Sequence, residues 1–283
     1  MMDDLDHLTY GVRDGIATVT WDRPEKLNAI TPAMRRAFIE ALRTAEADPA
    51  VHVIVLKGNG RAWCVGVDLE DMSRAHQDPA VRGVRLDARE IYEAADRWGT
   101  LWMIQKPIVV KVQGLCVGWG LEIALYADIV VAAEDAQFNY PSVRNGTGLP
   151  DSNMAIYHLG PQWAKYMLFT GDFIDGRTAE RIGLVLKAVP EAELDDEVET
   201  IARRMPAVPV DLLAESKGVL NKAIDLMGRH VLQQIAAESN AISRLNPFVA
   251  EWTRRVREEG NEAAIAWREE RQRAVQARSD GGR

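Results

Sequence analysis

Hydrophobic and polar positions follow two different periods along this chain. Residues 9–21 form two alternating runs broken at Asp14-Gly15, and this pattern predicts a β-hairpin. Short β-branched runs without alternation come next, as expected for strands that are buried on both faces. The strands predicted in this way cover residues 52–57, 108–113, 129–132 and 185–189.

Helical periodicity fills most of the sequence between these strands. Thr31-Pro32 predicts a helix start, with the hydroxyl as N-cap and the proline at the first helical position. The other helices before residue 193 are expected at about 87–104 and 122–126, and from about residues 152, 161 and 178. Only helical patterns remain after that point. We therefore expect an α/β core over residues 1–193 and a helical C-terminal region over residues 194–283.

Composition narrows the possible functions. The chain has 283 residues and a formal net charge of -8, which argues against sequence-independent binding of nucleic acid. It has no apolar stretch long enough to span a membrane, and its acidic N-terminus lacks the apolar core of a signal peptide. Its two cysteines, Cys64 and Cys116, have a spacing that leaves a disulfide open. We expect reduced thiols and a cytoplasmic location.

Two glycine-rich turns give the clearest chemical signal. One covers residues 62–68 and the other residues 114–122, and each follows a predicted buried strand and precedes a segment that can be helical. Such a turn leaves backbone N–H groups at a helix N-terminus, where they favour negative charge. Two N–H groups directed at one oxygen would form an oxyanion hole, with the carboxylate of Glu122 close by. This arrangement predicts an enzyme.

The order and spacing of the motifs resemble the enoyl-CoA hydratase/isomerase, or crotonase, superfamily. The resemblance rests on both glycine turns and on residues 22–29, 127–129, 136–138, 168–172 and 259–268. It implies an α/β fold in which a spiral of ββα turns forms two roughly perpendicular sheets, with a helical C-terminal extension. It also implies coenzyme A thioester substrates, no separate cofactor, and homotrimers or homohexamers in which residues 194–283 form contacts and cover the coenzyme A pocket.

The resemblance assigns the oxyanion hole to the backbone N–H groups of Val67, after Gly66, and Trp119, after Gly118. Trp119 stands where the family usually has glycine, so its indole should narrow or line the acyl pocket. Trp98 precedes the second turn on a predicted helix. It is most simply a core residue, and the alternative is that it caps the same pocket.

Glu122 matches the first of the two catalytic glutamates of hydratases. The alternative is a carboxylate that is only stabilised by the helix dipole. The second glutamate is expected 20 positions later, after Pro141, but Ser142 stands there. Because serine needs activation to act as a base, hydration by two carboxylates cannot simply be transferred to this chain.

Asp151 is the candidate replacement for the missing carboxylate. With one inserted residue it falls where dienoyl-CoA isomerases, dihydroxynaphthoyl-CoA synthases and chlorobenzoyl-CoA dehalogenases carry a functional aspartate. An N-cap role fits equally well. Tyr140 could donate a hydrogen bond to substrate or form part of the pocket wall. Arg144 could pair with Asp151 or with a carboxylate of the substrate.

Coenzyme A contacts follow from the same resemblance. Lys26 and the backbone at Ala62 and Cys64 match the family's nucleotide and pantetheine contacts, although a solvated lysine is the ordinary alternative. Arg268 and Arg271 on the final helix would meet the nucleotide of the same or a neighbouring subunit, or else face solvent. The histidines show no metal-ligand spacing, so no metal site is predicted.

The first hypothesis for function is therefore the addition of water to a 2-enoyl-CoA thioester. A second is a specialised CoA-thioester isomerase, hydrolase or ring-forming or ring-cleaving enzyme in which Asp151 leads. A third is an acyl-CoA-binding homologue without catalysis, motivated by Ser142 and Trp119. The expected partners are an acyl-CoA substrate and further copies of the chain, without nucleic acid or membrane.

Overall fold

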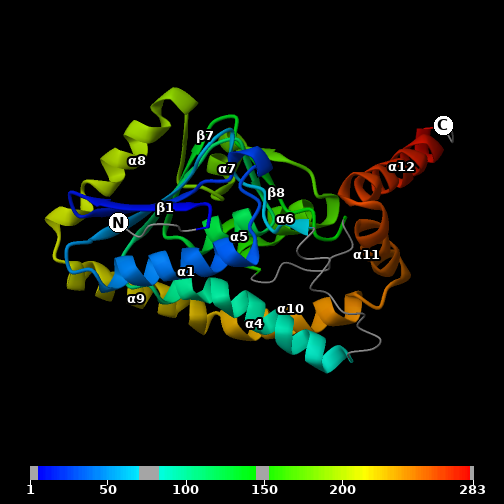
Figure 1. Ribbon diagram of the computed structural model, residues 1–283, viewed down its shortest axis with the longest axis horizontal. Coiled ribbons are helices and arrows are strands. Elements are labelled where there is room, and N and C mark those ends of the chain that lie inside the picture. Colours follow the sequence, from blue (N-terminus) through cyan, green and yellow to red (C-terminus); the bar gives the residue numbers. More distant parts are fainter. Residues whose placement is uncertain (1–5, 70–82, 145–152, 281–283) are drawn as a thin grey trace.

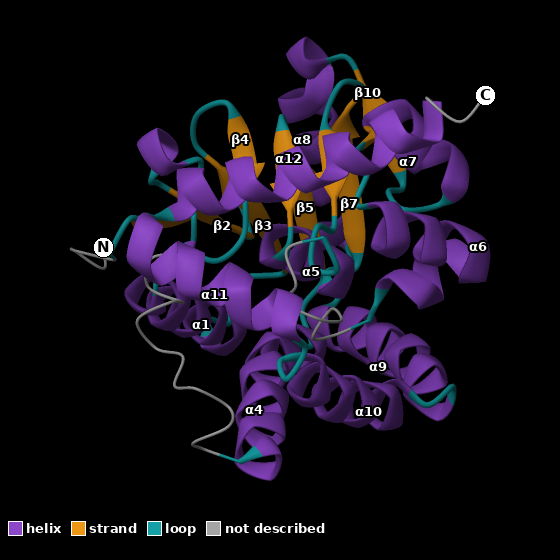
Figure 2. Cartoon of the chain, turned by 90° about the vertical axis from the view of Figure 1, so that its right-hand side faces the viewer, coloured by secondary structure: helices purple, strands orange, loops and turns teal. Residues whose placement is uncertain are grey.

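The computed structural model describes residues 6–69, 83–144 and 153–280. Two β-sheets lie at its centre (Figure 1). Helix α8 (Leu194–Ala202) covers one side. On the other side lie α1 (Pro32–Ala47), α4 (Val84–Met103), α9 (Val210–Leu226) and α10 (Arg229–Ser243) (Figure 2). The pair α11 (Pro247–Glu259) and α12 (Asn261–Asp280) extends from one end of the molecule.

The larger sheet has six strands in the order β1-β2-β3-β5-β7-β10. Its strands are β1 (Leu8–Arg13), β2 (Ile16–Trp21), β3 (Val53–Gly58), β5 (Ile108–Val112), β7 (Ile129–Ala133) and β10 (Lys187–Val189). β1 and β2 form the antiparallel hairpin predicted at Asp14-Gly15, and the other pairs are parallel. The interior parallel strands are almost wholly buried, which is why their sequences do not alternate.

The smaller sheet has the order β4-β6-β8-β9. Its strands are β4 (Ala62–Cys64), β6 (Leu115–Val117), β8 (Gln137–Asn139) and β9 (Ile174–Asp175). The first three each follow directly after a strand of the larger sheet, and β6 pairs in parallel with both β4 and β8. This repetition confirms the predicted spiral of strand pairs and helices.

The helices of the core agree with the predicted ones apart from their ends. α1 (Pro32–Ala47) begins at Thr31, whose side chain accepts a hydrogen bond from the N–H of Met34. α4 (Val84–Met103) and α5 (Trp119–Tyr126) each begin three residues earlier than expected. The two helices predicted from about residues 152 and 161 lie in the span of α6 (Ala155–Thr170), which Gly160 divides with a non-helical φ of 71° and ψ of 173°. α7 (Gly176–Ile182) follows.

The described residues after Leu194 are helical or form short connections. The helices are α8 (Leu194–Ala202), α9 (Val210–Leu226), α10 (Arg229–Ser243), α11 (Pro247–Glu259) and α12 (Asn261–Asp280). α8 packs on β5 and β7 and buries Leu194 and Val198 in the main core. α10 packs along α4, whereas Trp252 of α11 belongs to a separate apolar cluster. The division of the chain at residue 193 into two domains stays a prediction.

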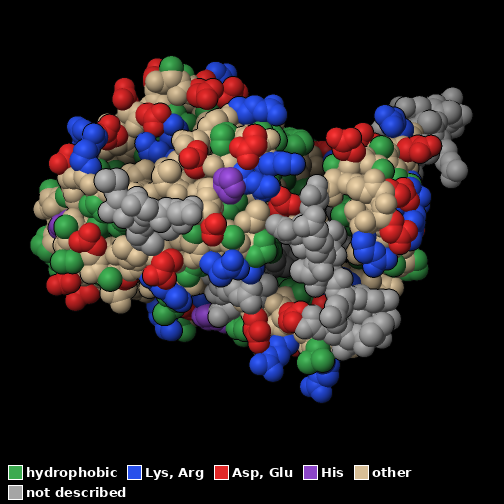
Figure 3. Space-filling view, viewed as in Figure 1, with side chains coloured by type: hydrophobic (Ala, Val, Ile, Leu, Met, Phe, Trp, Pro, Cys, Tyr) green, Lys and Arg blue, Asp and Glu red, His purple; other side chains and the backbone are tan. Residues whose placement is uncertain are grey.

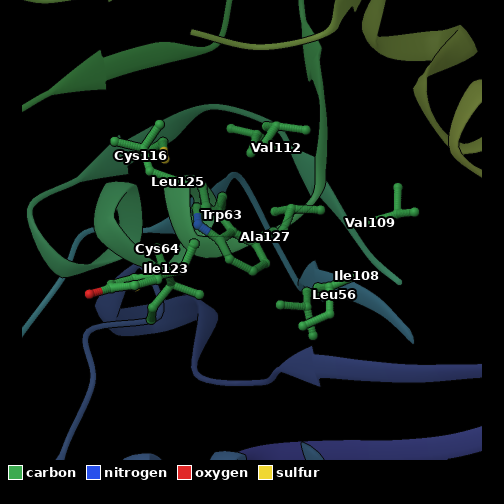
Figure 4. Packing of buried hydrophobic residues seen from close by; sticks show 14 of the residues in the cluster. Leu56, Trp63, Cys64, Ile108, Val109, Val112, Cys116, Ile123, Leu125 and Ala127 are labelled. Carbon is green, nitrogen blue, oxygen red and sulfur yellow. The ribbon is translucent and has the colours of Figure 1, made fainter. Parts of the chain in front are cut away.

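The main core surrounds α5 and the short strands that carry the glycine turns. Figure 4 shows side chains from β3, β4, β5, β6 and α5 gathered in it. Trp63 of β4 is fully buried, and its indole N–H donates a hydrogen bond to the carbonyl of Gly120 at 3.0 Å. The core therefore fixes the two turns relative to each other.

Acidic and basic side chains are mixed over the face shown in Figure 3. Within the described ranges, none of the helices combines the length and the apolar character needed to span a membrane.

Candidate functional site

The two glycine turns lie side by side because β4 and β6 are paired strands. Cys64 and Cys116 are partners in this pairing, so the turns that follow them leave the sheet together. Gly66 has a φ of +92°, and a Cβ on it would lie 3.0 Å from the backbone nitrogen of Trp119. Only glycine fits at such a close approach with a positive φ. The sequence predicted that these turns would meet, and the structure brings them together.

The hydrogen bonds around Val67 fix the direction of its backbone. The N–H of Ile30 donates to the carbonyl of Gly66 at 2.7 Å, and the N–H of Asp68 donates to the carbonyl of Ile30 at 2.9 Å. The two residues that flank Val67, Gly66 and Asp68, are thus both bonded to Ile30. Because successive peptide groups of an extended chain point to opposite sides, the N–H of Val67 points away from Ile30.

Trp119 is the first residue of α5. Its N–H therefore points out of the helix N-terminus, on the side where negative charge is favoured. The preceding Gly118 is held in place because its own N–H donates to the carbonyl of Asn139 in β8 at 3.1 Å. The joint role of Val67 and Trp119 as an oxyanion hole stays a prediction.

Glu122 lies in the first turn of α5 and is completely buried. Its N–H donates to the carbonyl of Gly118 at 3.0 Å, which closes the first turn of the helix. The helix N-terminus stabilises a carboxylate at this position. Glu122 is thus one helical turn away from the N–H of Trp119. This geometry suits a group that handles a proton beside the oxyanion site, and its catalytic role stays a prediction.

The indole of Trp119 lies at the end of a row of aromatic rings. Its centroid is 5.4 Å from that of Trp98, with the two planes at 72°. Trp98 in turn contacts Phe38, which stacks on Trp21. Trp98 is fully buried, whereas Trp119 is half-buried. The buried ring of Trp98 thus packs against Trp119 in the core, and the alternative that Trp98 caps the acyl pocket stays a prediction.

The residues expected beyond β8 are only partly placed. Tyr140 is buried in the main core and Ser142 is half-buried. Asp151 lies outside the described residues, so both its capping role and its catalytic role stay predictions. Arg144 donates a hydrogen bond to the carbonyl of Gly171 at 3.0 Å, which ties it to the turn after α6.

The predicted coenzyme A contacts lie in two parts of the fold. Lys26 is exposed at the end of the short 3-10 helix Pro24–Lys26, while Ala62 and Cys64 are buried in β4. Arg268 and Arg271 lie on α12, where their side chains lie over aromatic rings of α11 and α12. Their roles toward coenzyme A stay predictions.

Burial lowers the pKa of Arg268, and the positive charge of Arg144 lowers it further. Arg268 lies 5.8 Å above the ring of Trp252. Arg144, in the loop after β8, is therefore close enough to Arg268 on α12 for the two positive charges to interact. This proximity could not be predicted from the sequence.

Comparison with known proteins decides the family. The model of the enoyl-CoA hydratase/isomerase family matches residues 11–256, which is most of the chain. The chain belongs to this family. Hydroxycinnamoyl-CoA hydratase-lyase of Pseudomonas fluorescens is 33% identical over 215 residues, covering 73% of this chain and 75% of that protein. The mitochondrial enoyl-CoA hydratase of Pongo abelii is 30% identical over 220 residues, covering 76% and 72%.

Solved structures extend the likeness to the whole fold of this crotonase. An enoyl-CoA hydratase from Mycobacterium smegmatis superposes with a TM-score of 0.86 at 34% identity, covering 95% of this chain and 94% of that one. An enoyl-CoA hydratase/isomerase from Xanthobacter autotrophicus Py2 gives a TM-score of 0.84 at 30% identity, covering 95% and 99%. The crotonase fold predicted from the sequence is therefore confirmed.

The first turn of this crotonase depends on Asn28, which the sequence analysis did not single out. Asn28 is completely buried, with a φ of +57° that asparagine tolerates better than most residues. Its side-chain amide donates to the carbonyls of Asn59, Ala62 and Trp63 at 2.9, 2.9 and 3.1 Å. Asn28 belongs to the segment 22–29 that supports the family resemblance, which pointed to the segment as a whole. Its hydrogen-bond partners lie more than 30 residues away in the sequence, so its role in the turn could not be predicted.

An ion pair adds a second link to the same turn. Arg23 and Asp68 are 2.7 Å apart, and each side chain is at most 16% exposed. Arg23 also donates to the carbonyl of Ala29 at 3.0 Å. The loop before α1 is therefore linked through Arg23 to Asp68, the residue that directly follows Val67.

The two cysteines are free thiols. Burial raises the pKa of the Cys64 thiol to about 12 and raises that of Cys116 as well. Such thiols are unreactive. The reduced state expected from the sequence, and not the disulfide, is the one that the structure contains.

The described residues also form a groove of about 670 Å³ around α6, β9 and α7. It is lined by Gln137, Gln162, Trp163, Tyr166, Phe173, Ile174, Asp175, Thr178 and Arg181. The predicted site residues are absent from this lining. In the described part of the chain, histidine, cysteine and acidic side chains do not gather in threes that could hold a metal ion.

Proposed function

We propose that this crotonase adds water to 2-enoyl-CoA thioesters. The observation that carries the proposal is the meeting of the two turns. A Cβ on Gly66 would lie 3.0 Å from the nitrogen of Trp119, and Glu122 is buried within the first turn of α5. The similarity to enoyl-CoA hydratases over most of the chain supports the same reaction.

In this reaction the N–H groups of Val67 and Trp119 donate hydrogen bonds to the thioester oxygen. Glu122 accepts a proton from water as the water oxygen bonds to C3, and the electron pair of the double bond moves toward the thioester oxygen. The protonated Glu122 then delivers the proton to C2, which restores the carboxylate and completes the addition of one water. Each oxyanion donor is worth about 10²- to 10³-fold in rate.

This sequence of steps needs only one carboxylate, so Ser142 fits it. It also needs no metal ion and no redox cofactor, because the N–H groups polarise the carbonyl. The proposal therefore gives Ser142 no proton to carry. Whether Asp151 assists Glu122 is tested by Asp151→Asn, for which unchanged turnover would leave Glu122 as the acting carboxylate.

The test uses Glu122→Gln, which keeps the shape of the side chain and removes its basicity. We expect hydration of crotonyl-CoA, followed by the loss of ultraviolet absorbance of the conjugated thioester, to fall by about 10²- to 10⁴-fold. Ser142→Ala is the control and should stay close to the wild-type rate. Equal rates in the wild type and Glu122→Gln would remove Glu122 from the chemistry.

A second candidate is hydration followed by cleavage between C2 and C3. The 33% identity to hydroxycinnamoyl-CoA hydratase-lyase favours it. Cleavage would convert the 3-hydroxy thioester into an aldehyde and acetyl-CoA, with the same N–H groups holding the departing enolate. Mass spectrometry of the products separates the two reactions, since hydration alone adds the mass of one water.

We also propose that the chain acts as a homotrimer or homohexamer. The support is a set of strongly exposed apolar side chains on α9, on α10 and in the turn between them, a feature of interaction surfaces. These are Val219, Leu220, Leu226, Met227, Val231 and Ile235. Light scattering coupled to size-exclusion chromatography measures the mass directly, and a value of 31.5 kDa would refute the proposal. A cytoplasmic location stays a prediction.

A further inference from the structure

Trp119 contributes two groups to the same small region. Its backbone N–H is a donor in the proposed oxyanion hole, and its side chain leaves the chain at the adjacent Cα. A thioester oxygen bound to that N–H is therefore close to the residue that carries the indole. The half-buried indole is thus a candidate to line the path of the acyl carbons C2 and C3, which continue from the same carbonyl.

The indole has little freedom to move aside. Its ring meets the edge of Trp98 at 5.4 Å, and the guanidinium of Arg35 lies 5.9 Å from its centroid. Trp98 is fully buried and packs on Phe38 at 6.3 Å. Rings in contact on several sides can adopt few rotamers, so the indole is a rigid surface.

Helix α4, which carries Trp98, is itself fixed along its length by α10. Asp87 near its start pairs with Arg244 at 2.7 Å, and Trp102 near its end lies 4.8 Å below the guanidinium of Arg229. Both ends of α4 are therefore fastened to the antiparallel α10. The support behind the indole therefore comes from two packed helices.

We infer that the indole of Trp119 is a specificity-determining surface that selects flat, conjugated acyl groups, namely 2-enoyl thioesters with an aryl group on C3. This inference rests on the proposed function. A rigid aryl group stacks on a fixed indole with a gain beyond its buried area. A flexible alkyl chain of similar size must lose rotamer freedom to fit the same surface.

The experiment compares kcat/KM for cinnamoyl-CoA and trans-2-hexenoyl-CoA in the wild type, Trp119→Phe and Trp119→Leu. Phenylalanine keeps an aromatic face, whereas leucine keeps apolar bulk without it, and both keep the backbone N–H. We expect the cinnamoyl-to-hexenoyl ratio to fall by about 2- to 10-fold in Trp119→Leu and to be retained in Trp119→Phe. Trp163→Leu, in the groove beside α6, is the matched control and should leave the ratio unchanged.

Binding separates this inference from the proposed function. In a Glu122→Gln background, calorimetry gives the ratio of the two dissociation constants without turnover, and Trp119→Leu should lower the preference for cinnamoyl-CoA by a similar factor. If the wild type hydrates neither thioester, the proposed function fails and the binding ratio still decides the inference. If Trp119→Leu leaves both ratios unchanged, or Trp163→Leu changes them equally, the inference is overturned while hydration stands.

Discussion

Gly66 has no room for a side chain. A Cβ there would lie 2.9 Å from the carbonyl oxygen of Val117 and 3.0 Å from the nitrogen of Trp119, and its φ of +92° strains any other residue. Glycine is thus required at this position because two chain segments approach each other closely there, and not because the loop needs to be flexible. The same approach is what would direct the two N–H groups toward one oxygen.

Gly66→Ala should therefore damage the site more than the fold. We expect hydration of crotonyl-CoA to fall by at least about 10²-fold, because Trp119 must shift, and stability to fall by about 1–3 kcal/mol from backbone strain. Steady-state rates and urea denaturation measure the two effects.

Gly218→Ala is the control for that experiment. Gly218 is exposed on α9, and a Cβ there would meet nothing within 4 Å. Alanine at this helical position should stabilise the protein by about 0.5–1 kcal/mol and leave the rate unchanged. A Gly66→Ala enzyme with full activity would contradict the close-approach argument.

Two buried polar residues show which site residues can be predicted from the sequence and which cannot. Glu122 could be singled out because it follows a glycine turn at a fixed spacing. Asn28 could not, because its partners Asn59, Ala62 and Trp63 become neighbours only when β4 is in place. A pattern of neighbouring residues in the sequence cannot predict contacts between residues that are far apart in the chain.

Among the elements, α7 shows how one side chain can define a helix end. Asp175 is its N-cap and accepts a hydrogen bond from the N–H of Thr178 at 2.7 Å. That bond is the main reason why the pKa of Asp175 lies below its ordinary value of 3.8. The ionised carboxylate is therefore the form that stabilises the helix.

Because the pKa of Asp175 is lower in the folded protein, its contribution is complete above pH 3.8 and is lost as the pH falls through the lowered value. We expect Asp175→Ala to cost about 0.5–2 kcal/mol at neutral pH. Asp175→Asn should keep most of the cap without this pH dependence. Thermal unfolding of the three proteins between neutral and acidic pH checks the prediction, and parallel curves for the wild type and Asp175→Asn would contradict it.

Helix ends were the least predictable feature of the elements. The start of α1 was recognised because Thr31 and Pro32 act locally. α5 begins at Trp119, earlier than expected, directly after Gly118, whose N–H donates to the carbonyl of Asn139 in β8. No side chain caps this helix start, so the local sequence carries no capping residue that could locate it.

For the whole molecule, the separation of two apolar clusters predicts which part can be removed. Trp252, Val256 and Ala264 form a cluster that shares no residue with the main core. A chain ending at Asn246 should therefore keep a cooperative unfolding transition near that of the full chain. Circular dichroism measures this, and loss of the transition would show that α11 and α12 are part of the core.

The same truncation addresses the coenzyme A prediction. If Arg268 and Arg271 meet the nucleotide, the KM for crotonyl-CoA should rise while kcat is kept. The full-length variant Arg268→Gln/Arg271→Gln should reproduce the rise in KM. An unchanged KM in both proteins would leave these arginines with their aromatic contacts alone.

Local patterns in the amino-acid sequence predicted the hairpin at Asp14-Gly15, the strands of the larger sheet, most helices and the family, because periodicity, caps and glycine turns act over a few residues. They did not predict β4, β6 and β9 of the smaller sheet as strands. Which distant groups meet became known from the folded structure. It paired β4 with β6, joined Arg23 to Asp68, placed Trp98 behind Trp119, and set Arg268 over Trp252. Such contacts depend on the packing of segments that are far apart in the chain. The sequence contains many residues of the same chemical type that could make each contact, and only the folded arrangement shows which of them do.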